Sequence, residues 1–171
     1  MNNNNKIRGF EFISAEQALK DCEPERLNEV VFGENTSLIR PKRGTCKSAG
    51  YDIFAPFNIT LQPNEEIKVP TFLKVYMQDG EVLMAFPRSG LGFKYYCRLS
   101  NTVGIIDSDY YNNPNNEGHM FVKIRNEGNK TMTIKQGEAM CQMIFVPFLL
   151  ADGDSFDNGD KRLGGFGSTT K

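Results

Sequence analysis

Tryptophan is absent from this chain of 171 residues, and histidine occurs only once, as His119. The four cysteines form no Cys-x-x-Cys pair, so the close-spaced ligands of a structural zinc site are missing. Such spacing predicts free buried thiols rather than a disulfide framework, which is typical of a reducing compartment. We therefore expect a cytoplasmic protein.

Long apolar runs and excess charge are absent as well. The longest apolar run, from Met143 to Ala151, is interrupted by Pro147 and is too short to cross a bilayer. The N-terminus starts with Met1 and four asparagines, without the charged-then-apolar pattern of a signal peptide. The formal net charge is −1, which argues against binding to nucleic acid or to a membrane surface. A basic pocket for one small anion remains open.

The length suits one domain with extensions. Residues 1–35 differ from the rest and are expected to form an N-terminal extension. In it, Ser14 and Gln17 fit a capping box, which predicts a short helix over Ala15–Cys22. Residues 36–150 are expected to form the main domain. Residues 151–171, rich in Gly, Asp, Ser and Thr, predict a flexible C-terminal arm.

Short β-rich runs separated by turn residues recur from Thr36 onwards. Many short strands at near-regular spacing, without a long helical periodicity, predict an all-β fold, an antiparallel jelly-roll sandwich or barrel. The expected strands are Ser37–Arg40, Tyr51–Phe54, Ile67–Val69, Phe72–Met77, Glu81–Phe86, Met120–Arg125, Thr131–Ile134 and Ala139–Leu149.

Three segments at or near these strands place polar groups where a strand prefers apolar residues. Asp52 follows Gly50 at a strand start, where it binds a cation, solvent or a neighbouring chain, or closes its own turn. Arg88, Ser89 and Gly90 suit phosphate oxygens with a guanidinium fork, a hydroxyl and an accessible backbone, although a plain loop is equally open. Gln142 lies in an apolar strand, so its amide either satisfies backbone groups or faces a ligand.

A further segment runs from Asn101 to Tyr110. A β-hairpin with Asn101 and Gly104 would present backbone groups to the edge of a base. The purely structural alternative is an Asx turn that closes the hairpin. Asp107 follows two isoleucines, so partial burial is expected to raise its pKa and make it a better general base. Tyr110 supplies an aromatic face.

The last segment, Lys161–Thr170, joins cations, glycines, one phenylalanine and hydroxyls. It is not a Walker A loop, because no lysine follows the glycines before the Ser/Thr, and no strand–helix unit makes it a dinucleotide fingerprint. A flexible arm that closes over a phosphate and a base is one interpretation, and a disordered tail is the other.

The order and spacing of these five segments resemble the five motifs of the trimeric dUTPase family, over about residues 36–171. The resemblance implies a jelly-roll homotrimer that hydrolyses dUTP to dUMP and pyrophosphate with Mg²⁺. Three active sites would lie between subunits. In each, the Asp52, Arg88 and Gln142 segments would come from one chain, the Asp107 segment from a second and the arm from a third.

The resemblance also implies a role for each matched residue. Asp107 is the general base that activates water for attack on the α-phosphorus, and Tyr110 packs beneath the deoxyribose and excludes a 2′-OH. Mg²⁺ is held mainly by the phosphates and water, without a direct protein ligand, and Asp52 acts behind the phosphate-binding residues. The remaining residues read the uracil edge (Asn101, Gly104, Ile105, Ile106), bind phosphate (Arg88, Ser89, Gly90, Gln142, Arg162) or close the arm over the base (Phe166, Gly167, Ser168).

The sequence departs from the family pattern in three places. A longer loop, residues 111–119, follows Tyr110 and borders the expected nucleoside pocket. Lys161 stands where the family has an arginine, so it competes with Arg162 for the γ-phosphate. Phe93 is an alternative to Phe166 as the aromatic lid, or it packs at the trimer contact.

Two other functions compete with the diphosphatase. A dCTP deaminase of the same fold would need a glutamate soon after the Asp107 segment, and Glu117 is available. A nucleotide-binding regulatory module without turnover is the alternative from another class.

Overall fold

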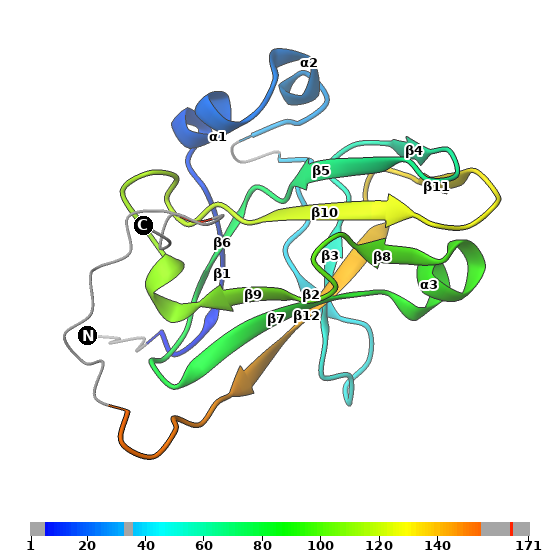
Figure 1. Cartoon of the computed structure of the whole chain (residues 1–171). Helices are drawn as coiled ribbons and strands as arrows, with labels where there is room; N and C mark the ends of the chain where they lie inside the picture. Colours follow the sequence, from blue (N-terminus) through cyan, green and yellow to red (C-terminus); the bar gives the residue numbers. More distant parts are fainter. Residues whose placement is uncertain (1–5, 33–35, 155–164, 166–171) are drawn as a thin grey trace.

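The computed structural model describes residues 6–32, 36–154 and 165, and its regular structure is mainly antiparallel β-sheet (Figure 1). The expected all-β jelly-roll fold is confirmed. The strands are β1 (Gly9–Phe12), β2 (Lys42–Arg43), β3 (Tyr51–Phe54), β4 (Ile59–Leu61), β5 (Glu66–Pro70), β6 (Leu73–Tyr76), β7 (Glu81–Pro87), β8 (Cys97–Leu99), β9 (Gly104–Asp107), β10 (Phe121–Asn126), β11 (Met132–Ile134) and β12 (Ala139–Pro147).

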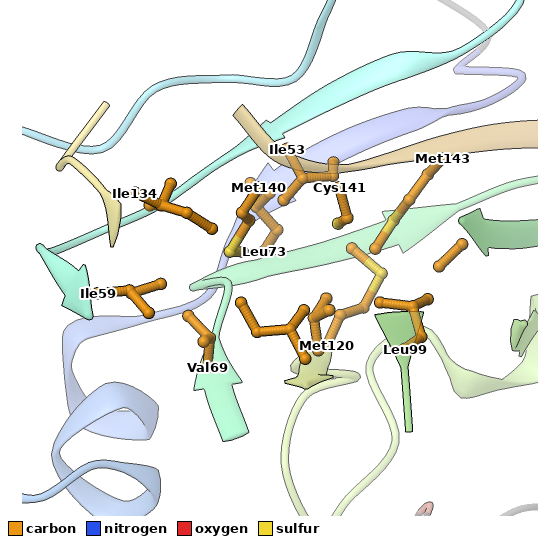
Figure 2. Packing of buried hydrophobic residues seen from close by; sticks show 14 of the residues in the cluster. Ile53, Ile59, Val69, Leu73, Leu99, Met120, Ile134, Met140, Cys141 and Met143 are labelled. Atoms are coloured by element: carbon orange, nitrogen blue, oxygen red, sulfur yellow. The ribbon is translucent and has the colours of Figure 1, made fainter. Parts of the chain in front are cut away.

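Two sheets contain most of these strands. One has the order β2-β3-β12-β7-β9 and the other the order β5-β10-β8, and the pairs β1-β6 and β11-β4 complete the fold. Side chains of Ile53 and Met143 in the first sheet point toward Val69 and Leu99 of the second (Figure 2). All four are at most 2% exposed, so the core lies between the sheets. It is the principal source of stability for the fold.

The N-terminal extension is built into this fold. It contains β1, α1 (Ala15–Asp21) and α2 (Pro24–Leu27), and β1 pairs with β6. The predicted cap is present, because Ser14 Oγ accepts a hydrogen bond of 3.0 Å from the Gln17 N–H. The extension packs against the main domain in a second core beside the first, which contains Ile13, Ala18 and Val30 of the extension and Leu38 and Phe72 of the main domain.

Three expectations about strand bounds and cysteine burial were wrong. Residues 37–40 are not a strand, because the backbone N–H of Ser37 bonds to Val31 O and Leu38 is buried in the second core. The last strand ends at Pro147 instead of Leu149. The four cysteines are free, but only Cys97 and Cys141 are buried. Among the described residues, no helix is long and apolar enough to span a membrane.

Candidate active site

A pocket of about 670 Å³ lies where β9 approaches β10. It has an apolar wall with a few polar groups, as small-molecule sites commonly do. The expected residues of the Asp107 segment all line it. The lining includes Asn101, Gly104, Ile105, Ile106, Asp107 and Tyr110, with Lys68, Phe121 and Lys123 on the other side.

Asn101 lies in the turn that connects β8 to β9, two strands of different sheets. β8 pairs with β10, whereas β9 pairs with β7, so the expected hairpin between β8 and β9 is wrong. Each strand finds its ladder partner elsewhere, and the turn is closed by a 2.9 Å hydrogen bond from the Thr102 N–H to Leu99 O. Asn101 nevertheless lines the pocket.

Asp107 ends β9, and its side chain is exposed in the single chain. Partial burial was expected because two isoleucines precede it. The strand alternates, however, so that Ile106 packs against the core while Ile105 and Asp107 face outward. Ile105 is 57% exposed, which leaves an apolar surface beside the carboxylate.

Tyr110 closes a short 3₁₀ turn, η1 (Ser108–Tyr110), and is 8% exposed. Its Oη donates a 2.9 Å hydrogen bond to His119 O and accepts one of 2.8 Å from Asn116 Nδ2. The ring therefore stands in the pocket wall with its hydroxyl turned toward loop 111–119. Sequence reasoning found Tyr110 but missed Asn116, because the contact depends on how this loop folds back.

A second group of predicted residues gathers at the other end of β7. Asp52 of β3 lies opposite Gln142 of β12, and Gln142 lies opposite Phe86 of β7. Arg88 follows β7, and its Nε lies 3.2 Å from Asp52 Oδ1. The Gln142 side-chain Nε2 donates a 3.1 Å hydrogen bond to Pro87 O, so this amide satisfies a backbone group. The structure thus brings Asp52, Arg88 and Gln142 together.

The backbone after Arg88 forms a helix, α3 (Ser89–Tyr95). The sequence did not predict this helix and had a plain loop as one alternative here. Arg88 is the N-cap, and Ser89 and Gly90 form the first turn. A Cβ added at Gly90 would have no atom within 4 Å, so the approach to this turn is open. Phe93, on the same helix, is 90% exposed. An aromatic ring this exposed is available to pack on a ligand or on another chain.

The two groups lie far apart within one chain. Asp107 is opposite Val82 on β7, whereas Arg88 comes after the end of that strand. A strand rises about 3.3 Å per residue, which separates the backbones at positions 82 and 88 by roughly 20 Å. Asp107 and Arg88 of one chain therefore do not face a common small ligand.

The remaining predicted residues, Lys161, Arg162, Phe166, Gly167 and Ser168, lie outside the described part of the chain. Gly165 is described, and it touches the pocket. A Cβ added there would lie 2.7 Å from Tyr110 Cε2, so only a glycine permits this approach to the ring.

Glu117, the residue that a deaminase would use, points elsewhere. Its carboxylate accepts hydrogen bonds from Ser14 N, at 3.2 Å, from Ser14 Oγ and from Lys74 Nζ. Burial raises the pKa of Glu117, but these donors outweigh it and hold the pKa below its ordinary value of 4.5. Among the described lining residues of the pocket, Glu117 does not occur.

A family model described as dUTPase matches residues 36–170. The chain belongs to the dUTPase family. A Lactococcus lactis protein named deoxyuridine 5′-triphosphate nucleotidohydrolase is 44% identical over 164 residues, covering 96% of this chain and 98% of that protein. Most of the extension before residue 36 therefore has a counterpart there. A protein of the same name from Chromobacterium violaceum is 41% identical over 135 residues, covering 75% of this chain and 86% of its own length.

Solved structures agree with this membership. The crystal structure of dUTPase from Streptococcus mutans has a TM-score of 0.64 and 41% sequence identity, covering 85% of this chain and 99% of that one. A dUTPase from phage phi11 of S. aureus has a TM-score of 0.61 at 19% identity, covering 88% of this chain and 96% of its own. The second likeness concerns the fold alone.

Proposed function

We propose that this chain is a dUTP diphosphatase that hydrolyses dUTP to dUMP and pyrophosphate. The observation that carries the proposal is the 44% identity to the L. lactis deoxyuridine 5′-triphosphate nucleotidohydrolase along nearly the whole of both chains. The pocket supports it, because the residues of the Asp107 segment that are expected to read a deoxynucleoside all line one cavity.

Within the pocket, the Asp107 carboxylate takes a proton from the water that attacks the α-phosphorus. The backbone between Asn101 and Ile106 meets the uracil edge, and the Tyr110 ring lies under the deoxyribose and leaves no room for a 2′-OH. The exposed side of β9 supports this assignment, since Asp107 and Ile105 face outward from the same strand surface.

The phosphates bind to Arg88, Ser89, Gly90 and Gln142. The pairing of Arg88 with Asp52 holds the guanidinium near Gln142, and Asp52 acts behind it rather than on the substrate. Mg²⁺ is compatible with a phosphate site that has few carboxylates, because phosphate oxygens and water commonly supply most of its ligands. When bound, it neutralises charge on the triphosphate.

The active form is a homotrimer with sites shared between subunits. The roughly 20 Å between positions 82 and 88 supports this, because one substrate needs a general base and a phosphate site only a few ångströms apart. Arg88 of one subunit would then serve the same dUTP as Asp107 of another. Closed cyclic symmetry repeats that arrangement three times.

The C-terminal arm, residues 151–171, closes over a neighbouring site with Phe166, Gly167 and Ser168 at the base and with Arg162 or Lys161 at the γ-phosphate. The rest of the chain comprises the extension, residues 1–35, and the main domain, residues 36–150. The four free cysteines support a cytoplasmic location, where thiols stay reduced.

The alternatives are weaker on the same observations. A deaminase would place Glu117 at the pyrimidine, but that carboxylate is engaged with Ser14 and Lys74. A regulatory module without turnover would not require a general base, and its function would not explain why Asp107 lines the same pocket as Tyr110.

The test is release of pyrophosphate from dUTP, UTP, dTTP, dCTP and dATP with Mg²⁺. We expect rapid release from dUTP alone. No release from any of them would favour the regulatory module, and ammonia from dCTP would favour the deaminase. Sedimentation tests the trimer separately, and a stable monomer with full activity would contradict shared sites.

A further inference from the structure

Loop 111–119 folds back under Tyr110 and is fixed there by asparagine side chains. Asn113 is 4% exposed, and its Nδ2 donates to Tyr110 O at 2.9 Å and to Asn116 Oδ1 at 2.8 Å. Its Oδ1 accepts from the backbone N–H groups of Asn115 and Asn116, at 3.1 and 3.2 Å. All the hydrogen-bonding groups of this buried amide are used, which makes the loop a defined structure rather than a loose connection.

The orientation of the Asn116 amide follows from its partners. Its Oδ1 accepts from the Gly118 N–H at 3.1 Å, and a backbone N–H can only donate. The Nδ2 group must therefore face the Tyr110 hydroxyl, 2.8 Å away. Because the hydroxyl accepts from Asn116, its own proton goes to His119 O at 2.9 Å. Both hydrogen-bonding directions of the phenol are thus fixed by this loop.

Gly118 permits the loop to come this close. Its φ is +81°, and a Cβ added there would lie 2.5 Å from Tyr110 O. A side chain at this position would force the loop away from Tyr110.

The far side of the loop is anchored to the N-terminal extension and to β6. Glu117 binds Ser14 at the start of α1 and Lys74 on β6, and His119 binds Asp21 at the end of α1. The loop therefore cannot retreat from Tyr110 without breaking these contacts to α1 and β6.

We propose that Asn116 is a positioning residue for Tyr110 and a determinant of sugar selectivity. The Asn116 amide and the His119 carbonyl hold the phenol from behind, so that the ring keeps the position at which it excludes a 2′-OH. This inference rests on the proposed function only for the role of Tyr110 toward deoxyribose; the contacts themselves belong to the free protein.

The experiment compares Asn116→Asp with the matched change Asn115→Asp in the same loop. Asn116→Asp keeps the size and the Gly118 acceptor but removes the donor to Tyr110, whereas the Asn115 side chain is exposed. We expect the ratio of kcat/KM for dUTP to kcat/KM for UTP to fall roughly three- to tenfold in Asn116→Asp, the effect of one hydrogen bond. Asn115→Asp should keep the wild-type ratio. Unchanged selectivity in Asn116→Asp overturns the proposal.

A companion series separates positioning from a general loosening of the loop. In a Tyr110→Phe background the hydroxyl is gone, so Asn116→Asp should have little further effect on the ratio. If Asn116→Asp lowers the ratio equally in both backgrounds, Asn116 does not act through Tyr110, and the proposal is wrong. Asn116→Ala serves as a second variant without the added charge.

A measurement on the ligand-free protein separates this proposal from the function itself. NMR of the Tyr110 ring should show faster ring flips in Asn116→Asp than in the wild type or Asn115→Asp. If the flips are faster in Asn116→Asp but the wild-type protein does not prefer dUTP, the proposed function is contradicted and the positioning contact stands. Unchanged flips would contradict the positioning contact whatever the substrate.

Discussion

His119 Nδ1 lies 2.7 Å from Asp21 Oδ2, which joins loop 111–119 to the end of helix α1. The other ring nitrogen, Nε2, accepts a 3.1 Å hydrogen bond from the Phe72 N–H. An imidazole that accepts at Nε2 is neutral, with its proton on Nδ1. The ring is fully buried and packs against Phe72 and Phe121, so one neutral histidine sits where the extension, the main core and the loop meet.

This arrangement predicts a loss of stability in mild acid. Burial lowers the pKa of His119 below its ordinary value of 6.5, and the nearby Asp21 only partly opposes that effect. Below pH 6.5 the unfolded chain takes up a proton that the folded chain does not, so the free energy of unfolding falls with pH. The contribution is complete above about pH 6.5 and is lost as the pH falls through the folded pKa. Urea unfolding at pH 7.5 and at pH 5.5 measures the difference.

His119→Gln is the control, because it cannot be protonated in this range. We expect it to be less stable at pH 7.5 and to lose much less stability than the wild type on going to pH 5.5. The carboxylates Glu11, Glu66, Glu81 and Glu117 have pKa values lowered from 4.5, so they act at lower pH. An equal loss in both proteins would remove His119 as the cause.

Asp107→Asn tests the general base. The amide cannot take the proton of the attacking water, so kcat for dUTP should fall by about 10²- to 10⁴-fold. Because Asp107 is exposed in the single chain, folding should change little. Nucleotide affinity should also be kept, because the proposed role of Asp107 is toward the attacking water. Stopped-flow release of pyrophosphate and equilibrium binding of a non-hydrolysable dUTP analogue measure the two effects. A variant with near-normal kcat would take Asp107 out of this role.

Deletion of residues 160–171 and the substitution Phe93→Ala identify the aromatic lid. If Phe166 stacks on the uracil, the deletion should lower kcat/KM for dUTP by about ten- to hundredfold, the effect of losing one stacked base contact. Phe93→Ala should then have a small effect on kcat/KM. The reverse result would assign the lid to Phe93, which is 90% exposed on α3.

Several features could be predicted from the sequence because local chemistry determines them. Ser14 caps α1 through a bond to a residue three positions later, and the capping pattern is visible in the sequence. Strands such as β7 and β10 show alternating burial, which follows from the twofold period of side chains along a strand. The spacing of the family motifs then pointed to Tyr110, which lines the pocket, and to Gln142, which lies opposite Asp52.

Other features depend on contacts that no local pattern shows. Helix α3 was missed because Gly90 and Gly92 are poor helix formers, each costing about 1 kcal/mol relative to alanine. The exposure of Asp107 depends on which face of β9 meets β7, and the bonds between Asn116 and Tyr110 depend on the path of a loop. An asparagine-rich segment predicts a turn, but it does not predict which side chain the turn will hold.

The substitution Gly50→Ala is a steric test of Gln142 as a phosphate-binding residue. A Cβ added there would lie 2.8 Å from Gln142 Oε1, too close for the present side-chain position. Gly50→Ala should therefore displace the Gln142 amide from Pro87 O and from bound phosphate. The loss of about one hydrogen bond should raise KM for dUTP roughly three- to tenfold, with a smaller change in kcat.

Gln142→Ala provides the decisive background for this test. With the side-chain oxygen gone, the atom nearest to the Cβ of Gly50→Ala is the Cβ at position 142, at an ordinary contact distance of 3.5 Å. The double variant should therefore have the KM of Gln142→Ala alone. Gly44→Ala is the matched control, because its nearest atoms are 3.9 Å away and its KM should stay at the wild-type value. If Gly50→Ala raises KM equally with and without the Gln142 side chain, Gly50 acts through the backbone of its own turn, and Gln142 loses this support for a place at the phosphates.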